Sequence, residues 1–208
     1  MTTVDLKNAM APLADDGFPK AAAVYCASSS KIPAVYFDAA RRLGQALANA
    51  GLTAVSGGGR SGLMGTLIDG ATEAGGSTIA VIPSFMVDRG WNHPGATKTI
   101  VTESMHERKL TMARLSRAAI ALPGGCGTFE ELLEIITWRQ LGLFSGHVVI
   151  VNVDGYYDPL LALFDRAVDQ HFMNPDHRGL FHLTNSVDEA VAIALAPVSV
   201  KNFTQKIV

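Results

Sequence analysis

The residues of this sequence that could do chemistry gather around one glycine turn. Pro123 is followed by three glycines within four positions, Gly124, Gly125 and Gly127, and then by the segment 128–131. Such glycines allow positive φ angles and let a ligand approach the backbone closely. The free N–H groups of a following helix would face the same space, which suits an anion such as a phosphate. An ordinary tight turn between a strand and a helix is the alternative.

Thr128-Phe129-Glu130-Glu131 fits two interpretations. In the first, favoured by spacing alone, Thr128 is a helix N-cap and Glu131 completes a capping box. In the second, the Glu130 and Glu131 carboxylates border a site for a sugar phosphate. Cys126 precedes the expected helix, a setting that lowers a thiol pKa, but no partner base stands at a recognisable spacing, so we interpret it as a small filler.

Two cations on the preceding helix are further candidates. Residues 104–107 have capping-box spacing and predict that a helix starts there. Arg108 falls within the apolar stripe of this helix and Lys109 at its edge. A guanidinium beside a phosphate-binding turn can grip phosphate or ribose oxygens with two hydrogen bonds, which favours a functional role for Arg108 over snorkelling to water. For Lys109, function and snorkelling are equal alternatives.

Alternating strands and helices must position these residues. We expect strands at 21–26, 52–55, 77–82, 118–122, 147–151 and 180–183, and helices at 33–50, before 74, at 104–117, through 132–138, at 159–172 and at 187–196. The strands are continuous runs of Ala, Val, Ile and Leu, as in a parallel sheet covered by helices on both faces. The sequence thus predicts one α/β domain at 20–196, with a loosely ordered leader at 1–19 and a tail at 197–208. Residues 83–104 are expected to form a long, irregular, functional segment.

Three turns follow strand ends and should meet in one crevice, because ligands of open parallel sheets bind beyond the carboxyl ends of the strands. The turns cover residues 27–30, 56–62 and 123–128, and they supply the candidate binding residues Ser28, Gly58, Gly59 and Gly124 to Thr128. The spacing of Gly57, Gly59 and Gly62 fits a dinucleotide fingerprint, but the next strand ends without the acidic residue that holds the ribose. A mononucleotide pocket is therefore favoured, with a purely structural turn as the alternative.

The composition excludes several classes of protein. The formal net charge is −2 and no basic block occurs, so we expect neither nucleic acid nor a membrane as partner. The two cysteines, Cys26 and Cys126, lack metal-ligand or disulfide spacing, which favours a reducing compartment and no metal. No apolar run approaches the roughly 20 residues of a membrane span. We expect a cytoplasmic protein.

The stretch Met105-His106-Glu107-Arg108-Lys109, followed after one strand by the turn 123–131, closely resembles the Lonely Guy (LOG) family of cytokinin riboside 5′-monophosphate phosphoribohydrolases. The similarity continues through 137–142 and 152–157. The resemblance implies a Rossmann-like domain, a homodimer with the active site near the subunit interface, and no cofactor. It implies hydrolysis of the N-glycosidic bond of a nucleoside 5′-monophosphate, such as AMP or isopentenyl-AMP, to a free base and ribose 5-phosphate.

Arg108 and Glu131 match the catalytic pair of that family, and Lys109, the turn Gly125 to Glu130 and Thr137 resemble its nucleotide-binding positions. Relatives have often carried a lysine decarboxylase label, but Lys109 does not resemble a lysine that binds pyridoxal phosphate.

The chain departs from the family pattern at two places. Ala27 stands where a glycine is usual, and residues 87–90 read Val-Asp-Arg-Gly where many relatives have Pro-Arg-Glu with a glutamate that contacts the substrate. Two other functions stay open, a broader nucleoside-monophosphate nucleosidase and a module that binds or senses a mononucleotide without turning it over. The presence of both Arg108 and Glu131 favours the enzyme.

Overall fold

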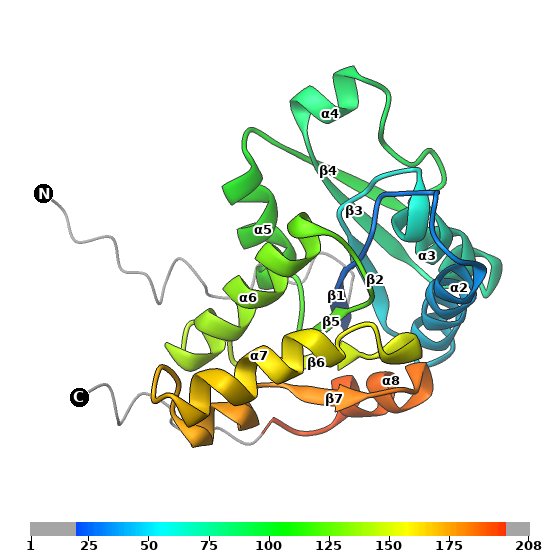
Figure 1. Ribbon diagram of the computed structural model, residues 1–208. Coiled ribbons are helices and arrows are strands. Elements are labelled where there is room, and N and C mark those ends of the chain that lie inside the picture. Colours follow the sequence, from blue (N-terminus) through cyan, green and yellow to red (C-terminus); the bar gives the residue numbers. More distant parts are fainter. Residues whose placement is uncertain (1–19, 199–208) are drawn as a thin grey trace, which may run out of the picture.

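Seven parallel strands form one sheet in the computed structural model, which describes residues 20–198 (Figure 1). The strands are β1 (Ala21–Tyr25), β2 (Thr53–Ser56), β3 (Thr78–Pro83), β4 (Lys98–Thr102), β5 (Ala118–Ala121), β6 (His147–Val151) and β7 (His182–Thr184). The helices are α2 (Ala34–Asn49), α3 (Gly62–Glu73), α4 (Ser84–Asp88), α5 (Met105–Arg114), α6 (Cys126–Gln140), α7 (Asp158–Asp169) and α8 (Val187–Leu195), with 3-10 turns η1 (Val153–Gly155) and η2 (Pro175–Leu180). The leader expected at 1–19 lies outside the described residues, as does the expected tail beyond residue 198.

The order of the strands explains where a ligand site can form. The sheet runs β4-β3-β2-β1-β5-β6-β7, so the chain builds outward from β1 to one edge and then returns to the centre for β5. β1 pairs with β2 on one side and with β5 on the other. The connections that leave β1 and β5 therefore diverge to opposite sides, which opens a crevice at the carboxyl ends of these two strands.

Two apolar cores, one on each face, hold helices against the sheet. Side chains alternate along β1, so that Ala21, Ala23 and Tyr25 belong to one core and Ala22 and Val24 to the other. α5, α6 and α7 cover the first face, and α2, α3 and α8 cover the second. The expected parallel sheet with helices on both faces is confirmed.

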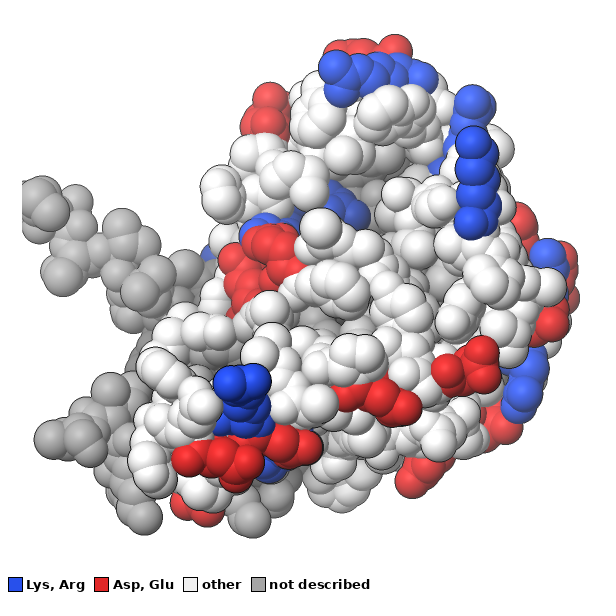
Figure 2. All heavy atoms as spheres, viewed as in Figure 1, with Lys and Arg blue, Asp and Glu red and all other residues white. Residues whose placement is uncertain are grey.

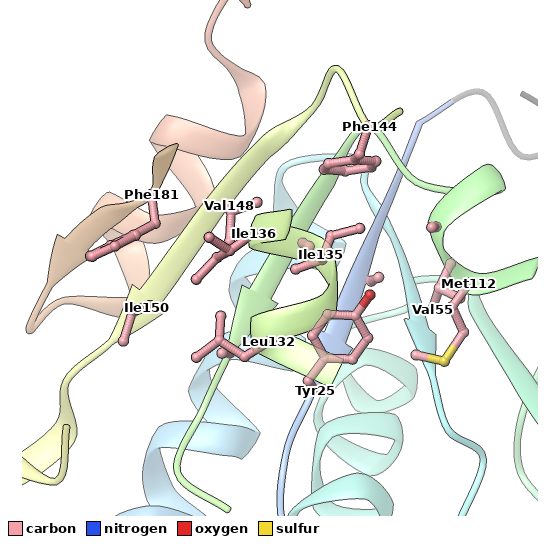
Figure 3. Close-up of a cluster of buried hydrophobic side chains, with 14 of the residues drawn as sticks. Tyr25, Val55, Met112, Leu132, Ile135, Ile136, Phe144, Val148, Ile150 and Phe181 are labelled. Atoms are coloured by element: carbon pink, nitrogen blue, oxygen red, sulfur yellow. The ribbon is translucent and has the colours of Figure 1, made fainter. Parts of the chain in front are cut away.

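Helix α6 owes its place to three apolar residues on one side. Leu132, Ile135 and Ile136 are buried and pack between Tyr25 of β1 and Val148 of β6 (Figure 3). Their spacing is that of one helix face, and burying each such side chain contributes about 1.5–3 kcal/mol. This packing fixes the start of α6 at the crevice.

The prediction of an irregular segment at 83–104 is wrong in part, because these residues include α4 and the edge strand β4. β4 pairs with β3 from Ile79 opposite Lys98 to Pro83 opposite Thr102. An edge strand needs no continuous apolar run, and Val101 on β4 is half exposed, so the pattern that marks the inner strands is missing here. No helix within residues 20–198 is long and apolar enough to cross a membrane.

Candidate active site

A cavity of about 640 Å³ opens at the carboxyl ends of the central strands. All three turns expected to meet there contribute to its wall, with Ser28 after β1, Gly59 after β2 and residues 125–128 after β5. Figure 2 shows the surface hollowed between α4 and α6, with basic and acidic side chains meeting over α5 and α6. The predicted convergence is confirmed.

The start of α6 forms one wall of this cavity. Gly125 is the N-cap, and no side chain of the described residues 20–198 caps the helix. Residues 125–128 line the cavity, so the free N–H groups of the first turn are available to an anion. The capping-box interpretation of Thr128 and Glu131 is wrong, because Thr128 lies inside the helix and the Glu131 carboxylate pairs with Arg108.

Two tyrosines hold this turn from behind. The Tyr156 hydroxyl donates to the Gly124 carbonyl at 2.5 Å, and the Tyr157 hydroxyl donates to the Leu122 carbonyl at 2.8 Å. Tyr157 is fully buried, and a buried hydroxyl needs a partner. Their hydroxyl groups thus bind the carbonyls that lead into α6.

Arg108 and Glu131 form a buried ion pair on the cavity wall. Their side chains are 7% and 8% exposed, and Nη1 of Arg108 lies 2.8 Å from Oε1 of Glu131. Arg108 also donates from Nε to the Val81 carbonyl at 3.1 Å, at the end of β3. The alternative that Arg108 snorkels to water is therefore wrong. Two hydrogen bonds to different elements hold the guanidinium at the crevice.

The Glu131 carboxyl is poised by two opposing effects. Burial raises its pKa above the ordinary value of 4.5, and the nearby Arg108 guanidinium lowers it without cancelling the effect of burial. A carboxyl with a raised pKa in a cavity, next to a specific charge partner, is typical of functional sites.

Gly57 makes room for the guanidinium. A Cβ atom at Gly57 would lie 1.8 Å from Nη2 of Arg108, closer than two non-bonded atoms can approach. Gly57 was not among the expected site residues, although the triplet of glycines after β2 was a signal. Of the other two, Gly59 lines the cavity, whereas Gly58 has a φ of +76° and packs against β3.

Lys109 does not line the cavity. Its ammonium group pairs with the carboxylates of Glu130 and Glu134, at 3.1 Å from the latter. Burial alone would lower the pKa of Lys109, but the hydrogen bonds to Glu130 and Glu134 outweigh it and raise this pKa. Since the Lys109 side chain is only 7% exposed, it does not snorkel to water. A role of Lys109 in binding the nucleotide stays a prediction.

The remaining expected residues are divided between the cavity and its surroundings. Cys126 and Glu130 line the cavity, whereas Gly124 packs against Thr128 behind the turn. Thr137 is exposed on α6 and donates to the Leu133 carbonyl at 2.8 Å. Across residues 20–198, no three His, Cys, Asp or Glu side chains lie close enough together to hold a metal ion.

A group of apolar residues on the cavity wall was missed. They come from α3, β3, α4, the segment after α4, and α5: Met64, Ile82, Met86, Trp91 and Met105. Their positions follow no shared period in the sequence, so only the fold brings them together. The signal that could have found one of them is the lone tryptophan in the segment expected to be functional.

These features define the class of the protein. It is a Rossmann-like α/β protein with a cavity at the switch point of its sheet, suited to a phosphate at one wall and an apolar group at another. A solved structure of the molybdenum cofactor carrier protein from Chlamydomonas reinhardtii shares the fold, with a TM-score of 0.64 and 24% identity over 83% of this chain and 94% of that chain.

Sequence comparison names the family. The family model described as "Possible lysine decarboxylase" matches residues 64–194. The cytokinin riboside 5′-monophosphate phosphoribohydrolase LOG5 of Arabidopsis thaliana is 44% identical over 172 residues, which cover 83% of this chain and 75% of that protein. The cytokinin riboside 5′-monophosphate phosphoribohydrolase of Rhodococcoides fascians is 39% identical and covers 86% of this chain and 91% of that protein. The chain therefore belongs to the LOG family.

Proposed function

We propose that this protein hydrolyses the N-glycosidic bond of an N6-substituted adenosine 5′-monophosphate, releasing the free base and ribose 5-phosphate. The observation that carries the proposal is the buried Arg108–Glu131 pair on the wall of a cavity that also contains the uncapped start of α6. The relatives named for this activity, at 39% and 44% identity, support it.

The start of α6 binds the 5′-phosphate in this proposal. Residues 125–128 line the cavity, the N–H groups of this first turn have no partner within the helix, and the positive end of the helix dipole favours the phosphate charge. Tyr156 and Tyr157 keep this backbone in place through the Gly124 and Leu122 carbonyls. The binding energy of the phosphate then positions the bond that breaks, which is remote from it.

Glu131 acts at the sugar. When the bond between C1′ and the base nitrogen breaks, the sugar passes through a state that resembles an oxocarbenium ion, and the Glu131 carboxylate stabilises its positive charge and orients water. The water oxygen bonds to C1′, the bonding pair leaves with the base, and the proton released by water ends on the base. Arg108 holds Glu131 and contacts ribose or phosphate oxygens.

Base release by the purified protein tests this proposal. We expect isopentenyl-AMP to be cleaved at least about a hundredfold faster than the unphosphorylated riboside, because only the nucleotide can use the start of α6. Equal rates on both substrates would contradict the phosphate site. Tight binding without base release would favour a sensing module, and equal rates on AMP, GMP, CMP and IMP would favour a broad nucleosidase.

The proposal includes a homodimer and a cytoplasmic location. Large apolar side chains are exposed on β4, α5 and α6, at Val101, Met105 and Leu133, which supports a second copy on that side. Sedimentation should give twice the mass of one chain, and Leu133→Asp should reduce it to one. The free cysteines Cys26 and Cys126 support a reducing compartment.

A further inference from the structure

The segment between β3 and β4 supplies an apolar wall to the cavity. Met86 on α4 and Trp91 just after it line the cavity together with Met64 and Met105. Among the described residues that line the cavity, the only carboxylates are Glu130 and Glu131, and both belong to α6. The wall formed by this segment therefore offers ring and thioether contacts to a ligand, and no acid to bind the edge of a base.

Trp91 is held in place although its side chain is half exposed. Its carbonyl accepts a hydrogen bond from Arg60 N–H at 2.8 Å, and its own N–H donates to the Met86 carbonyl at 3.1 Å. The Arg89 guanidinium lies 5.3 Å from the Trp91 ring and 5.4 Å from the Phe85 ring. One backbone contact to the glycine turn at Arg60, a second to Met86 on α4, and this stacked cation restrict where the indole can lie.

In the proposed binding mode, the base of the nucleotide lies against this apolar wall. With the phosphate at the start of α6 and the sugar beside Arg108 and Glu131, the base must extend to the part of the cavity that remains. Trp91 is 48% exposed, so its ring has surface left for a ligand. A purine ring stacks on an indole, and an alkyl chain fits the flexible thioethers of methionine.

We propose that Trp91, supported by Met86 and oriented by Arg89, is a specificity-determining residue that binds the base and its apolar N6 substituent. This inference rests on the proposed function and deepens it. It assigns the choice of substrate to ring and thioether contacts from Trp91 and Met86. Isopentenyl-AMP is then preferred over AMP because of Trp91.

The test compares kcat/KM for isopentenyl-AMP and AMP in variants of the full chain. Trp91→Ala should reduce the preference for isopentenyl-AMP by about tenfold, whereas Trp91→Phe should keep most of it because a ring remains. The matched control is Phe85→Ala, which removes the other ring that stacks on Arg89 but does not line the cavity. Its preference should stay within about twofold of the wild type.

Calorimetric dissociation constants for the same two nucleotides separate this inference from the proposed function. If the wild type releases no base, the proposed function is contradicted. The ratio of the dissociation constants for isopentenyl-AMP and AMP then still tests the role of Trp91. An unchanged preference in Trp91→Ala, with circular dichroism showing a folded protein, would overturn the inference. So would an equal loss in Phe85→Ala, because the effect would then come from the fold of the segment and not from the indole.

Discussion

Two ion pairs join α5 to α6 and differ in their exposure to solvent. The inner pair is Arg108 with Glu131, and the outer pair is Lys109 with Glu130. In the inner pair both side chains are buried, and burial outweighs the Arg108 charge, so the pKa of Glu131 rises. In the outer pair the Glu130 side chain is 53% exposed. The hydrogen bonds from Lys109 to the carboxylates of Glu130 and Glu134 outweigh the burial of Lys109, so the pKa of Lys109 rises. The outer pair thus stabilises its own charges and fastens two helices, whereas the inner pair holds a carboxylate that is costly to keep charged.

Removing the inner carboxylate should have the largest effect. Glu131→Gln keeps the size and loses the charge that stabilises the transition state, so kcat for base release should fall by about 10²–10³. The matched control is Glu73→Gln, whose carboxylate pairs with Arg41 in an exposed pair and should change kcat by less than twofold. Turnover near that of the wild type in Glu131→Gln would show that the carboxylate is not the catalytic group.

A double variant separates catalysis from stability. Arg108→Met with Glu131→Leu replaces a buried ion pair by apolar residues of similar size, which is often neutral or stabilising by about 1–4 kcal/mol. We expect an inactive protein whose free energy of unfolding, measured in urea, is no lower than that of the wild type. A loss of several kcal/mol would mean that the pair is kept for the fold.

Gly57→Ala should displace the Arg108 guanidinium of the inner pair. The new Cβ would stand where Nη2 of Arg108 lies, so the guanidinium must move away from Glu131. We expect kcat/KM to fall by about tenfold to a hundredfold, in line with the cost of a misplaced catalytic group. Gly59→Ala is the matched control, since its Cβ would meet only the flexible Met64 side chain, at 3.4 Å. Similar losses in both variants would contradict the role of Gly57.

The pH profile should report the inner carboxyl. The charged form of Glu131 is the active one and its pKa is raised, so the inactive protonated form persists to a higher pH than for an ordinary glutamate at 4.5. kcat/KM should therefore fall tenfold per pH unit on an acid limb that lies above 4.5. The substrate phosphate titrates near pH 6, so its ionisation, followed by phosphorus NMR, must be divided out. A remaining limb at or below 4.5 would contradict the raised pKa.

Breaking the outer pair should have the smallest effect. Lys109→Met removes the cation between Glu130 and Glu134, and because Glu130 is largely solvated the free energy of unfolding should fall by only about 1 kcal/mol. KM should rise by about threefold, since Glu130 lines the cavity and loses its support, while kcat should be unchanged. A kcat loss as large as that of Glu131→Gln would mean that Lys109 contacts the substrate.

The strands could be predicted because each is a local pattern, and the meeting of the three turns followed because ligands of open parallel sheets bind beyond the carboxyl ends of the strands. Buried strands of a parallel sheet are continuous apolar runs, and β1, β3 and β6 were predicted to within one residue at each end. The edge strand β4 was missed because two of its five side chains are exposed and alternate with less exposed ones. Val101 and its neighbours therefore carry no such run.

The sequence by itself determined the α/β order of elements, the glycine turn before α6, and the pair of residue types that could do chemistry, because spacing and residue type are properties of the chain. Only the tertiary structure decided what each side chain faces. Packing of α5 and α6 on the sheet turned Glu131 toward Arg108 instead of toward the helix start, and turned Lys109 toward Glu130 and Glu134. It also brought Trp91 to the cavity, since contacts between segments far apart in the sequence leave no local pattern to predict them.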